Sequence, residues 1–185
     1  HTLWHAECAK QIDYIVIAGT SPADINEKFT AMIGRAPKFP QWAAGFWQCK
    51  LRYETQEELL EVAREYKQRG LPISVIVIDY FHWTMQGEWK FDPVRWPDPK
   101  AMVEELESMG IKLMVSIWPT IDPRSENYEV MKNHNYLLRG EKGVDVVFMF
   151  FGPQTYVDCT HPDAQKFFWN RAKENYYDYG IKMYW

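Results

Sequence analysis

The alternation of short apolar segments with helical segments constrains the fold of this chain most strongly. The segment 73–79, ISVIVID, is apolar almost throughout until it reaches its final acid, as is typical of a strand buried on both faces. Such strands alternating with helices predict an α/β fold with a parallel sheet covered by helices. From residue 43 onward, strands are predicted over 43–50, 73–79, 111–118 and 181–185, with helices over 55–70, 99–110, 125–134 and 161–180.

Two closures of such a sheet compete, an open doubly wound sheet and a (β/α)8 barrel. Neither G-x-G-x-x-G nor G-x-x-x-x-G-K follows any predicted strand, although an open sheet that binds a nucleotide usually carries one of them. The pattern therefore favours the barrel. A complete TIM barrel takes about 250 residues, so four strands with their helices correspond to its first half.

The residues before the barrel pattern are organised differently. A strand is predicted over 9–18 and a helix over 21–34, with Ser21 as its N-cap. The Pro-rich segment 35–41 is a connector and the predicted domain boundary. Because the chain lacks an initial Met and ends within an apolar strand, it is expected to be a fragment of a longer protein.

Composition narrows the classes of partner. The net charge is −4 and no run of Lys or Arg occurs, so no nucleic-acid partner is expected. No apolar run approaches the ~20 residues of a membrane span. The three cysteines are odd in number, lie far apart and lack metal-binding spacing, so no disulfide framework is predicted. No residue spacing suggests a metal or other cofactor. The aromatic fraction of 16% suits either a core or a site that stacks rings on sugars.

Functional side chains of a barrel gather at the carboxyl ends of its strands. A carboxylate there can accept hydrogen bonds from two sugar hydroxyls while a neighbouring ring stacks on the sugar's apolar face. The predicted strand ends carry both kinds of group, the polar residues Lys50, Arg52, Asp79, His82 and Asp122 and the rings of Trp47, Tyr80, Trp83 and Trp118.

Structural roles compete with these functional ones. Asp79 could instead form an ion pair with Lys50 or Arg52, and Trp118 could be a core ring at a turn. His82 is expected to pack or to support another residue. The remaining acids are expected to be structural. Asp92 and Asp98 are expected to start turns before Pro, and Asp158 is expected to help cap the helix that follows it.

Linked motifs make the sequence resemble glycoside hydrolase family 31. They are VIVIDYFHW (75–83), WKFDPVRWPDP (89–99), MGIKLMVSIWP (109–119) and YVDCTHPDAQKFFW (156–169). The resemblance covers residues 36–185, which would be the N-terminal half of the (β/α)8 catalytic barrel. It implies that residues 1–35 are the tail of an N-terminal β-sandwich with a connecting helix.

Members of this family are mainly retaining, exo-acting α-glycosidases that use one Asp as nucleophile and a second acid as proton donor. The resemblance implies that the nucleophile lies two positions past Trp185 and the acid/base later still, so this chain alone is expected to be inactive. It implies a substrate-holding role for Asp79, followed by Tyr80, with ring contacts from Trp118 and Trp185. Weaker assignments from the first strand are Trp47 and Arg52.

The segments GFWQCKLRY and DYFHWTMQGEWKFDP look most like the family's α-xylosidases, which act on xyloglucan-type oligosaccharides. An α-glucosidase and a non-catalytic carbohydrate-binding member are the alternatives. Xylose lacks the C6 hydroxymethyl group, so rings such as Tyr80, Phe81, Trp83 or Trp185 are candidates for filling that space. A polysaccharide substrate favours a periplasmic or extracellular location, although relatives that process oligosaccharides can be cytoplasmic. A homo-oligomer of the full-length protein is left open.

Overall fold

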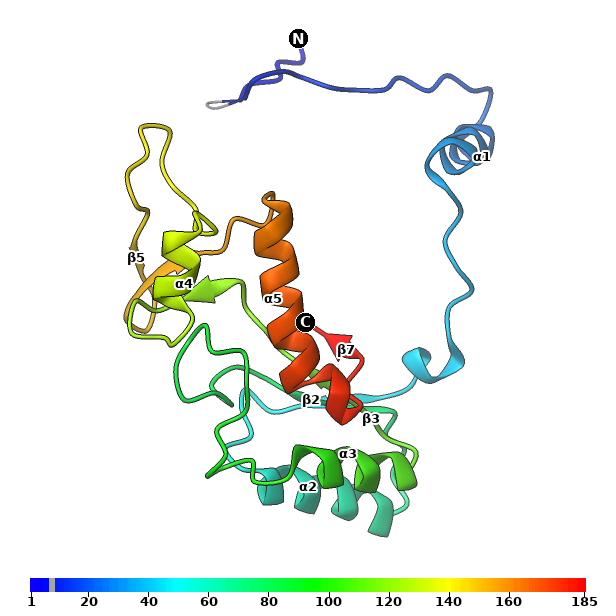
Figure 1. Ribbon diagram of the computed structural model, residues 1–185. Helices are drawn as coiled ribbons and strands as arrows, with labels where there is room; N and C mark the ends of the chain where they lie inside the picture. Colours follow the sequence, from blue (N-terminus) through cyan, green and yellow to red (C-terminus); the bar gives the residue numbers. More distant parts are fainter. Residues whose placement is uncertain (7–8) are drawn as a thin grey trace. The chain divides into compact units, whose positions relative to one another are not determined.

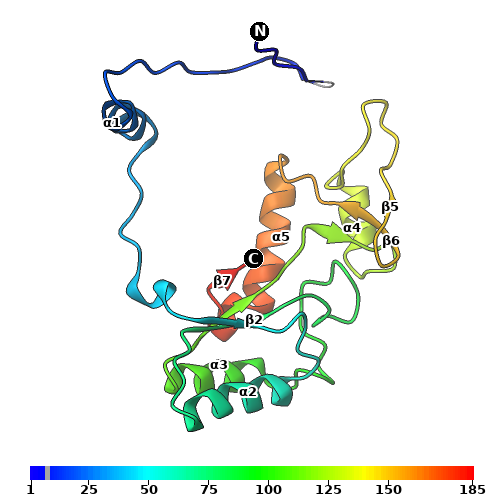
Figure 2. The same cartoon turned by 180° about the vertical axis from the view of Figure 1, so that it is seen from behind.

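A computed structural model describes residues 1–6 and 9–185 (Figures 1 and 2). The chain divides into two compact units, His1–Phe39 and Pro40–Trp185, and each is described by itself.

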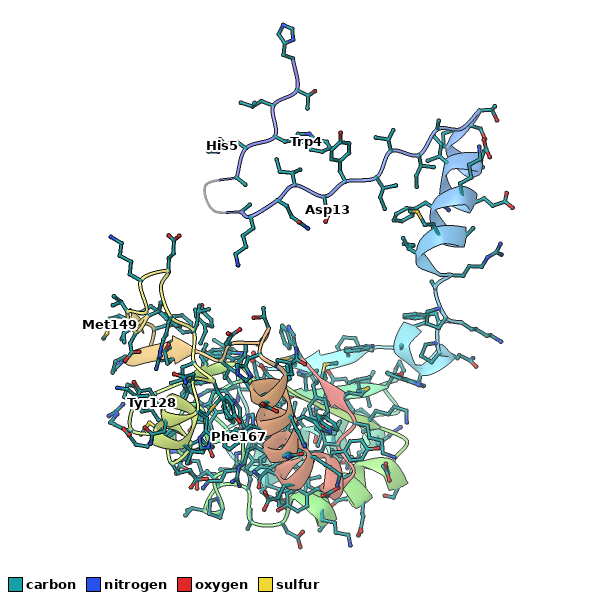
Figure 3. All side chains as sticks on the ribbon, turned by 45° about the horizontal axis from the view of Figure 1, so that its top comes forward. Trp4, His5, Asp13, Tyr128, Met149 and Phe167 are labelled. Carbon is teal, nitrogen blue, oxygen red and sulfur yellow. The ribbon has the colours of Figure 1, made fainter. Side chains whose placement is uncertain are left out.

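The first unit contains the predicted helix but not the predicted strand. Helix α1 spans Pro22–Ile33, and the Ser21 hydroxyl accepts a hydrogen bond from the Asp24 N–H at its start. The strand prediction for residues 9–18 is wrong, because these residues are extended and pair with no strand among the described residues. A strand exists only through hydrogen bonds to a neighbour. The rings of Trp4 and Tyr14 meet edge to face at 4.9 Å (Figure 3).

The second unit is built on a four-stranded parallel sheet. Its strands are β1 (Trp47–Cys49), β2 (Val75–Ile78), β3 (Lys112–Val115) and β7 (Met183–Tyr184), in the order β1-β2-β3-β7. The α/β class with a parallel sheet is therefore confirmed. These strands follow one another in chain order without reversal, which is the winding of a barrel, whereas a doubly wound sheet reverses direction at a switch point.

Helices α2 (Gln56–Gln68) and α3 (Pro99–Ser108) lie side by side on one face of the sheet (Figure 1). The Thr55 hydroxyl caps α2 by accepting from the Glu58 N–H at 3.2 Å, and the Asp98 carboxylate caps α3 by accepting from the Ala101 N–H at 2.9 Å. The sequence predicts Thr55 as the cap of the helix over 55–70, and this prediction is confirmed. Asp98 was expected to start a turn and instead caps a helix.

An ion-pair network joins the two helices. The Arg64 guanidinium binds both carboxylate oxygens of Glu105, at 2.6 and 3.0 Å, and also Glu57 at 2.5 Å. The apolar faces beneath it are buried and contact the sheet. All four residues of β2 are at most 3% exposed, which explains the continuously apolar sequence of that strand.

The long helix before the last strand is α5 (Pro162–Asn175), followed by the 3₁₀ turn η2 (Tyr177–Tyr179). The expectation that Asp158 caps this helix is wrong. His161 is the N-cap, and its ring accepts from the Asp163 N–H at 3.2 Å. Asp158 instead accepts hydrogen bonds from Thr160, which precedes the cap.

A small antiparallel sheet is inserted between β3 and α5. Its strands are β4 (Thr120–Ile121), β6 (Pro153–Tyr156) and β5 (Phe148–Met149), in the order β4-β6-β5, with helix α4 (Tyr128–Asn133) beside it. The sequence of residues 135–151 predicts a hairpin with a turn that contains glycine. It forms only near its tip, where Arg139 bridges Asp145, since β5 pairs with β6 instead.

The side chains of this insertion divide between core and surface. Tyr128 on α4 is buried, whereas Met149 on β5 is 75% exposed (Figure 3). No helix in the ranges 1–6 and 9–185 is long and apolar enough to cross a membrane.

Candidate active site

The carboxyl ends of the parallel strands bring three predicted site residues to one edge of the sheet. Asp79 directly follows β2, Trp118 follows β3 and Trp185 follows β7. Hydrogen bonds hold this edge together, from the Ser116 N–H to the Ile78 carbonyl at 2.8 Å and from the Ile117 N–H to the Trp185 carbonyl at 2.9 Å. The parallel register therefore gathers residues that lie far apart in the sequence.

An aromatic cluster surrounds this edge. It consists of Tyr80, Phe81, Trp83, Trp118, Phe150 and Phe151. The Tyr80 ring lies 5.3 Å from Trp118 and is stacked at 5.9 Å on Phe151, as measured between ring centroids. These rings come from the loop after β2, the loop after β3 and the turn between β5 and β6. The cluster offers flat apolar faces beside a carboxylate.

Asp79 is half-buried and keeps most of its hydrogen-bonding capacity. One carboxylate oxygen accepts from the Tyr80 N–H at 2.8 Å. Neither suggested ion-pair partner binds it among the residues described, since Lys50 pairs with Glu58 and Arg52 lies 3.5 Å from Glu54. An ionised carboxylate has about four acceptor sites. The geometry therefore leaves the Asp79 carboxylate able to accept hydrogen bonds from hydroxyl groups.

The Cys49 thiol lies on the neighbouring strand β1, close to Asp79. Burial raises the pKa of Cys49, and the nearby negative charge of Asp79 raises that pKa further. The raised pKa keeps the thiol protonated, so Cys49 is not an activated nucleophile.

His82 is buried next to the main chain of Asp79 and is not open to solvent. The ring is fully buried, with Nδ1 3.0 Å from the Asp79 carbonyl oxygen and Nε2 2.9 Å from the Tyr176 hydroxyl. Burial lowers the pKa of His82 to about 4, with the hydrogen bond to Asp79 opposing that shift. His82 was expected to pack or to support another residue, and its complete burial confirms the packing.

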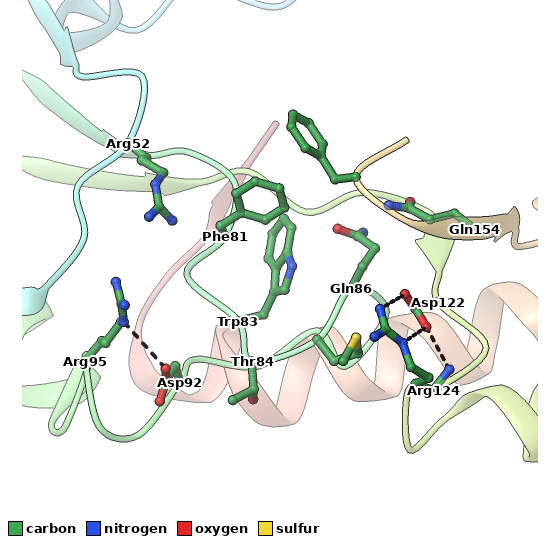
Figure 4. Close-up of a pocket in the computed structure, with 12 residues that line it drawn as sticks. Arg52, Phe81, Trp83, Thr84, Gln86, Asp92, Arg95, Asp122, Arg124 and Gln154 are labelled. Atoms are coloured by element: carbon green, nitrogen blue, oxygen red, sulfur yellow. Dashed lines mark hydrogen bonds and ion pairs between the residues drawn. The ribbon is translucent and has the colours of Figure 1, made fainter. Parts of the chain in front are cut away.

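A cavity of about 380 Å³ lies next to the aromatic cluster (Figure 4). Arg52 is the only one of the six predicted binding residues on its lining, and its guanidinium carbon lies 5.7 Å from the centre of the Phe81 ring. The other lining residues are Phe81, Trp83, Thr84, Met85, Gln86, Asp92, Arg95, Asp122, Arg124, Phe151 and Gln154.

Both acids on this lining are engaged in local structure. Asp122 is 2% exposed and binds Arg124 through two side-chain contacts of 2.8 and 2.9 Å, and these hydrogen bonds lower the pKa of its carboxyl group against the opposing effect of burial. Asp92 accepts from the Val94 N–H at 2.9 Å and lies 3.9 Å from Arg95. The expected turn role of Asp92 is confirmed, and neither acid is positioned as a free acid or base.

Trp47 does not join the predicted site. It is the first residue of β1 and pairs with Val75, the first residue of β2. Four residues separate Val75 from Asp79, or about 13 Å along a strand. The Trp47 ring stacks on Trp42 at 6.2 Å and donates its N–H to the Ala43 carbonyl. The expectation that Trp47 lies at the carboxyl ends is wrong, because the strand register places it at the opposite end.

Sequence reasoning missed several residues that the structure brings to this region. Phe150 and Phe151 reach the cluster from the β5–β6 turn, where Phe151 has a φ of 55° and precedes Gly152. The available signal was two bulky rings next to a glycine in a turn, where small polar residues are usual. The buried Gln154 and the exposed Arg124 gave no comparable signal.

The described residues hold no group of three or more His, Cys, Asp or Glu side chains arranged to bind a metal ion. The chemistry on offer is hydrogen bonding by one carboxylate and stacking by several rings. An acid at the end of a buried parallel strand beside such rings is a combination that can bind a sugar, with the carboxylate accepting from hydroxyl groups and the rings stacking on its apolar face.

A family model described as "Glycosyl hydrolases family 31 TIM-barrel domain" matches residues 36–185. The chain therefore belongs to glycosyl hydrolase family 31. Among curated relatives it is 51% identical over 185 residues to an uncharacterized family 31 glucosidase of Pseudescherichia vulneris, and 36% identical over 191 residues to α-xylosidase A of Aspergillus niger. Both alignments cover the whole chain, which spans only 35% and 26% of these relatives.

Two solved xylosidase structures are also similar to this chain. A family 31 α-xylosidase from a soil metagenome, crystallised with xylose, matches 91% of this chain and 25% of its own at 60% identity and a TM-score of 0.86. A xylosidase from Aspergillus niger matches 87% of this chain and 23% of its own at 37% identity and a TM-score of 0.82.

Proposed function

We propose that the full-length protein carrying this chain is a retaining, exo-acting α-xylosidase that removes non-reducing-end α-xylosyl residues from xyloglucan-type oligosaccharides. The observation that carries the proposal is the Asp79 carboxylate, which is free of ion pairs within residues 1–6 and 9–185 and stands beside the aromatic cluster at the carboxyl end of β2. α-Xylosidases among the similar proteins support the choice of reaction.

In this proposal the chain contributes the substrate-holding side of the site. Residues 36–185 form the first half of the catalytic barrel, and residues 1–35 belong to the end of an N-terminal β-sandwich with a connecting helix. Asp79 binds hydroxyl groups of the terminal sugar, with Trp118 and Trp185 as ring walls. The nucleophile and the acid/base are provided by residues outside the chain, and in a retaining enzyme their carboxyl groups stand about 5 Å apart.

The preference for xylose over glucose is assigned to Tyr80. Its ring packs against those of Trp118 and Phe151, so turning away would lose both contacts. A bulky ring fixed beside Asp79 restricts the space that a C6 hydroxymethyl group would need. Trp83 is 7% exposed and is less suited to touch a sugar directly.

An α-glucosidase is the second candidate, because "Alpha-glucosidase 2" of Bacillus thermoamyloliquefaciens is 31% identical to this chain over 178 residues. A non-catalytic carbohydrate-binding protein is the third. The residue two positions past Trp185 in the gene separates the last from the others, since Asp there supports catalysis whereas Asn, Ser or Gly refutes it.

The proposal is tested by assaying the full-length protein on 4-nitrophenyl α-D-xyloside and α-D-glucoside side by side. We expect kcat/KM to favour the xyloside by at least about tenfold, the lower end of what a pocket achieves for one small group. Proton NMR should show α-xylose as the first product. A preference for the glucoside refutes the sugar assignment, and β-xylose as first product refutes retention.

A further inference from the structure

The main chain of Asp79 is contacted by the buried side chain of His82, which in turn contacts the buried Tyr176, and the proposed mechanism uses neither residue. The last sheet hydrogen bond of β2 is accepted by the Ile78 carbonyl. Beyond it the chain turns sharply, and Phe81 adopts a φ of 63°, a left-handed conformation that a bulky residue rarely takes. The position of Asp79 therefore depends on contacts other than the sheet.

The first of these contacts comes from His82. A carbonyl oxygen only accepts hydrogen bonds, so the His82 Nδ1 atom, 3.0 Å from the Asp79 carbonyl, must carry the proton. In a neutral imidazole the other nitrogen then has a lone pair, and Nε2 accepts from the Tyr176 hydroxyl at 2.9 Å. The three groups form one directed chain, from the Tyr176 O–H through the imidazole to the Asp79 carbonyl.

Water does not reach these hydrogen bonds, because both side chains that form them are buried. His82 and Tyr176 are both 0% exposed. The His82 ring contacts Trp83 at 4.7 Å and Phe91 at 5.1 Å, and Phe91 also contacts Tyr176 at 5.1 Å. The rings fix the imidazole plane, so its two nitrogens keep their partners.

The hydrogen bond between Tyr176 and His82 connects two residues that are 94 positions apart in the chain. Tyr176 ends α5, and its carbonyl accepts from the Ile181 N–H at the entry to β7. β7 leads to Trp185 at the edge where Asp79 lies. The Tyr176–His82 contact thus joins the turn after β2 to the segment before the last strand.

We propose that His82 is a positioning residue: held by Tyr176, it fixes the main chain of Asp79 and so aims the Asp79 carboxylate at the sugar. This inference rests on the proposed sugar-binding role of Asp79. His82 touches neither substrate nor reacting atoms, and its effect is transmitted through Asp79.

The test uses variants of the full-length protein. His82→Leu removes both hydrogen bonds, His82→Asn retains a donor near the Nδ1 position, and Tyr176→Phe removes only the hydroxyl. We expect kcat/KM on the α-xyloside to fall at least 30-fold in His82→Leu and about fivefold or less in His82→Asn, with Tyr176→Phe between them. The matched control is His134→Leu, since the exposed His134 ring also contacts a carbonyl, that of Val130, at 2.8 Å.

A double-mutant cycle separates positioning from general stability. If His82 acts through Asp79, adding His82→Leu to Asp79→Ala reduces kcat/KM by less than threefold further. A further loss as large as in the wild-type background overturns the proposal. So does a His82→Asn variant that folds, by its circular dichroism, and is as impaired as His82→Leu.

A crystal structure of the full-length Tyr176→Phe or His82→Asn variant, whichever is more impaired, gives a readout independent of the reaction. We expect the Asp79 carboxylate to move by about 1 Å or more in an impaired variant. An unmoved carboxylate overturns the positioning role whatever sugar the protein hydrolyses. Absence of hydrolysis by the wild type would refute the proposed function, while a displaced Asp79 would still support the positioning role.

Discussion

Replacing Asp79 with Ala in the full-length protein tests the central element of the proposed site. One carboxylate oxygen already accepts from the Tyr80 N–H at 2.8 Å, which leaves about three of four acceptor sites. Two sugar hydroxyls can therefore bind. A hydrogen bond to a charged group contributes about 1.5–3 kcal/mol, so two contribute about 3–6 kcal/mol. At about 1.4 kcal/mol for each tenfold, kcat/KM should fall by roughly 10² to 10⁴.

The assay is the initial rate of 4-nitrophenol release from the α-xyloside, with circular dichroism as the folding check. Asp98→Ala is a matched control, because Asp98 caps α3 through the Ala101 N–H. It should lower the free energy of unfolding by about 1 kcal/mol and leave kcat/KM unchanged. A value for Asp79→Ala within about threefold of wild type would refute the reasoning, since the carboxylate would then bind no sugar hydroxyl that matters to the transition state.

Four further predictions concern other parts of the molecule. The purified 185-residue chain should release no xylose from the aryl xyloside, and detectable release would contradict the placement of the catalytic acids outside it. Tyr80→Ala in the full-length protein should raise the glucoside-to-xyloside ratio of kcat/KM by about tenfold, and an unchanged ratio would remove Tyr80 as the selecting ring. The buried His82, with its pKa lowered to about 4, binds a proton more readily in the unfolded state. The free energy of unfolding should therefore fall by up to ~3 kcal/mol as the pH drops from about 6.5 to 4. Urea titrations should show a smaller fall in His82→Asn. Gly87→Ala should lower the free energy of unfolding by about 2–4 kcal/mol, because the new Cβ would lie 2.4 Å from the Ile121 side chain at a φ of 93°. Gly110→Ala, which has a similar positive φ of 71° but open space around it, should cost only about 1–2 kcal/mol, and equal losses would contradict the steric reasoning.

The predictions from sequence that succeeded rest on interactions between residues close together in the chain. Thr55 is a cap because its side chain reaches an N–H three residues later. The apolar run of β2 predicted a strand buried on both faces, because every residue from Val75 to Ile78 must avoid water. The position of Asp79 followed from the end of that run, so the proposed sugar-binding acid was visible without a structure.

Pairing between distant segments decided the rest. The extended residues 9–18 satisfy the local pattern of a strand but find no partner in the described chain. Trp47 was assigned to the wrong end of β1, because only its register against Val75 says which end it occupies. Phe151 contacts Tyr80 because β5 pairs with β6. This pairing depends on both strands together and cannot be predicted from the sequence of either one alone.

The amino-acid sequence by itself therefore determined the strands of the parallel sheet and the helices between them, the family, and the acid that ends the second strand of the sheet. Only the tertiary structure decided which rings surround that acid. It also decided that His82 contacts the Asp79 carbonyl on one side and Tyr176, 94 residues later in the chain, on the other. The physical reason is that caps and apolar runs act within a few residues. Strand register and side-chain contacts instead depend on which distant segments pack together and on which of their residues become buried.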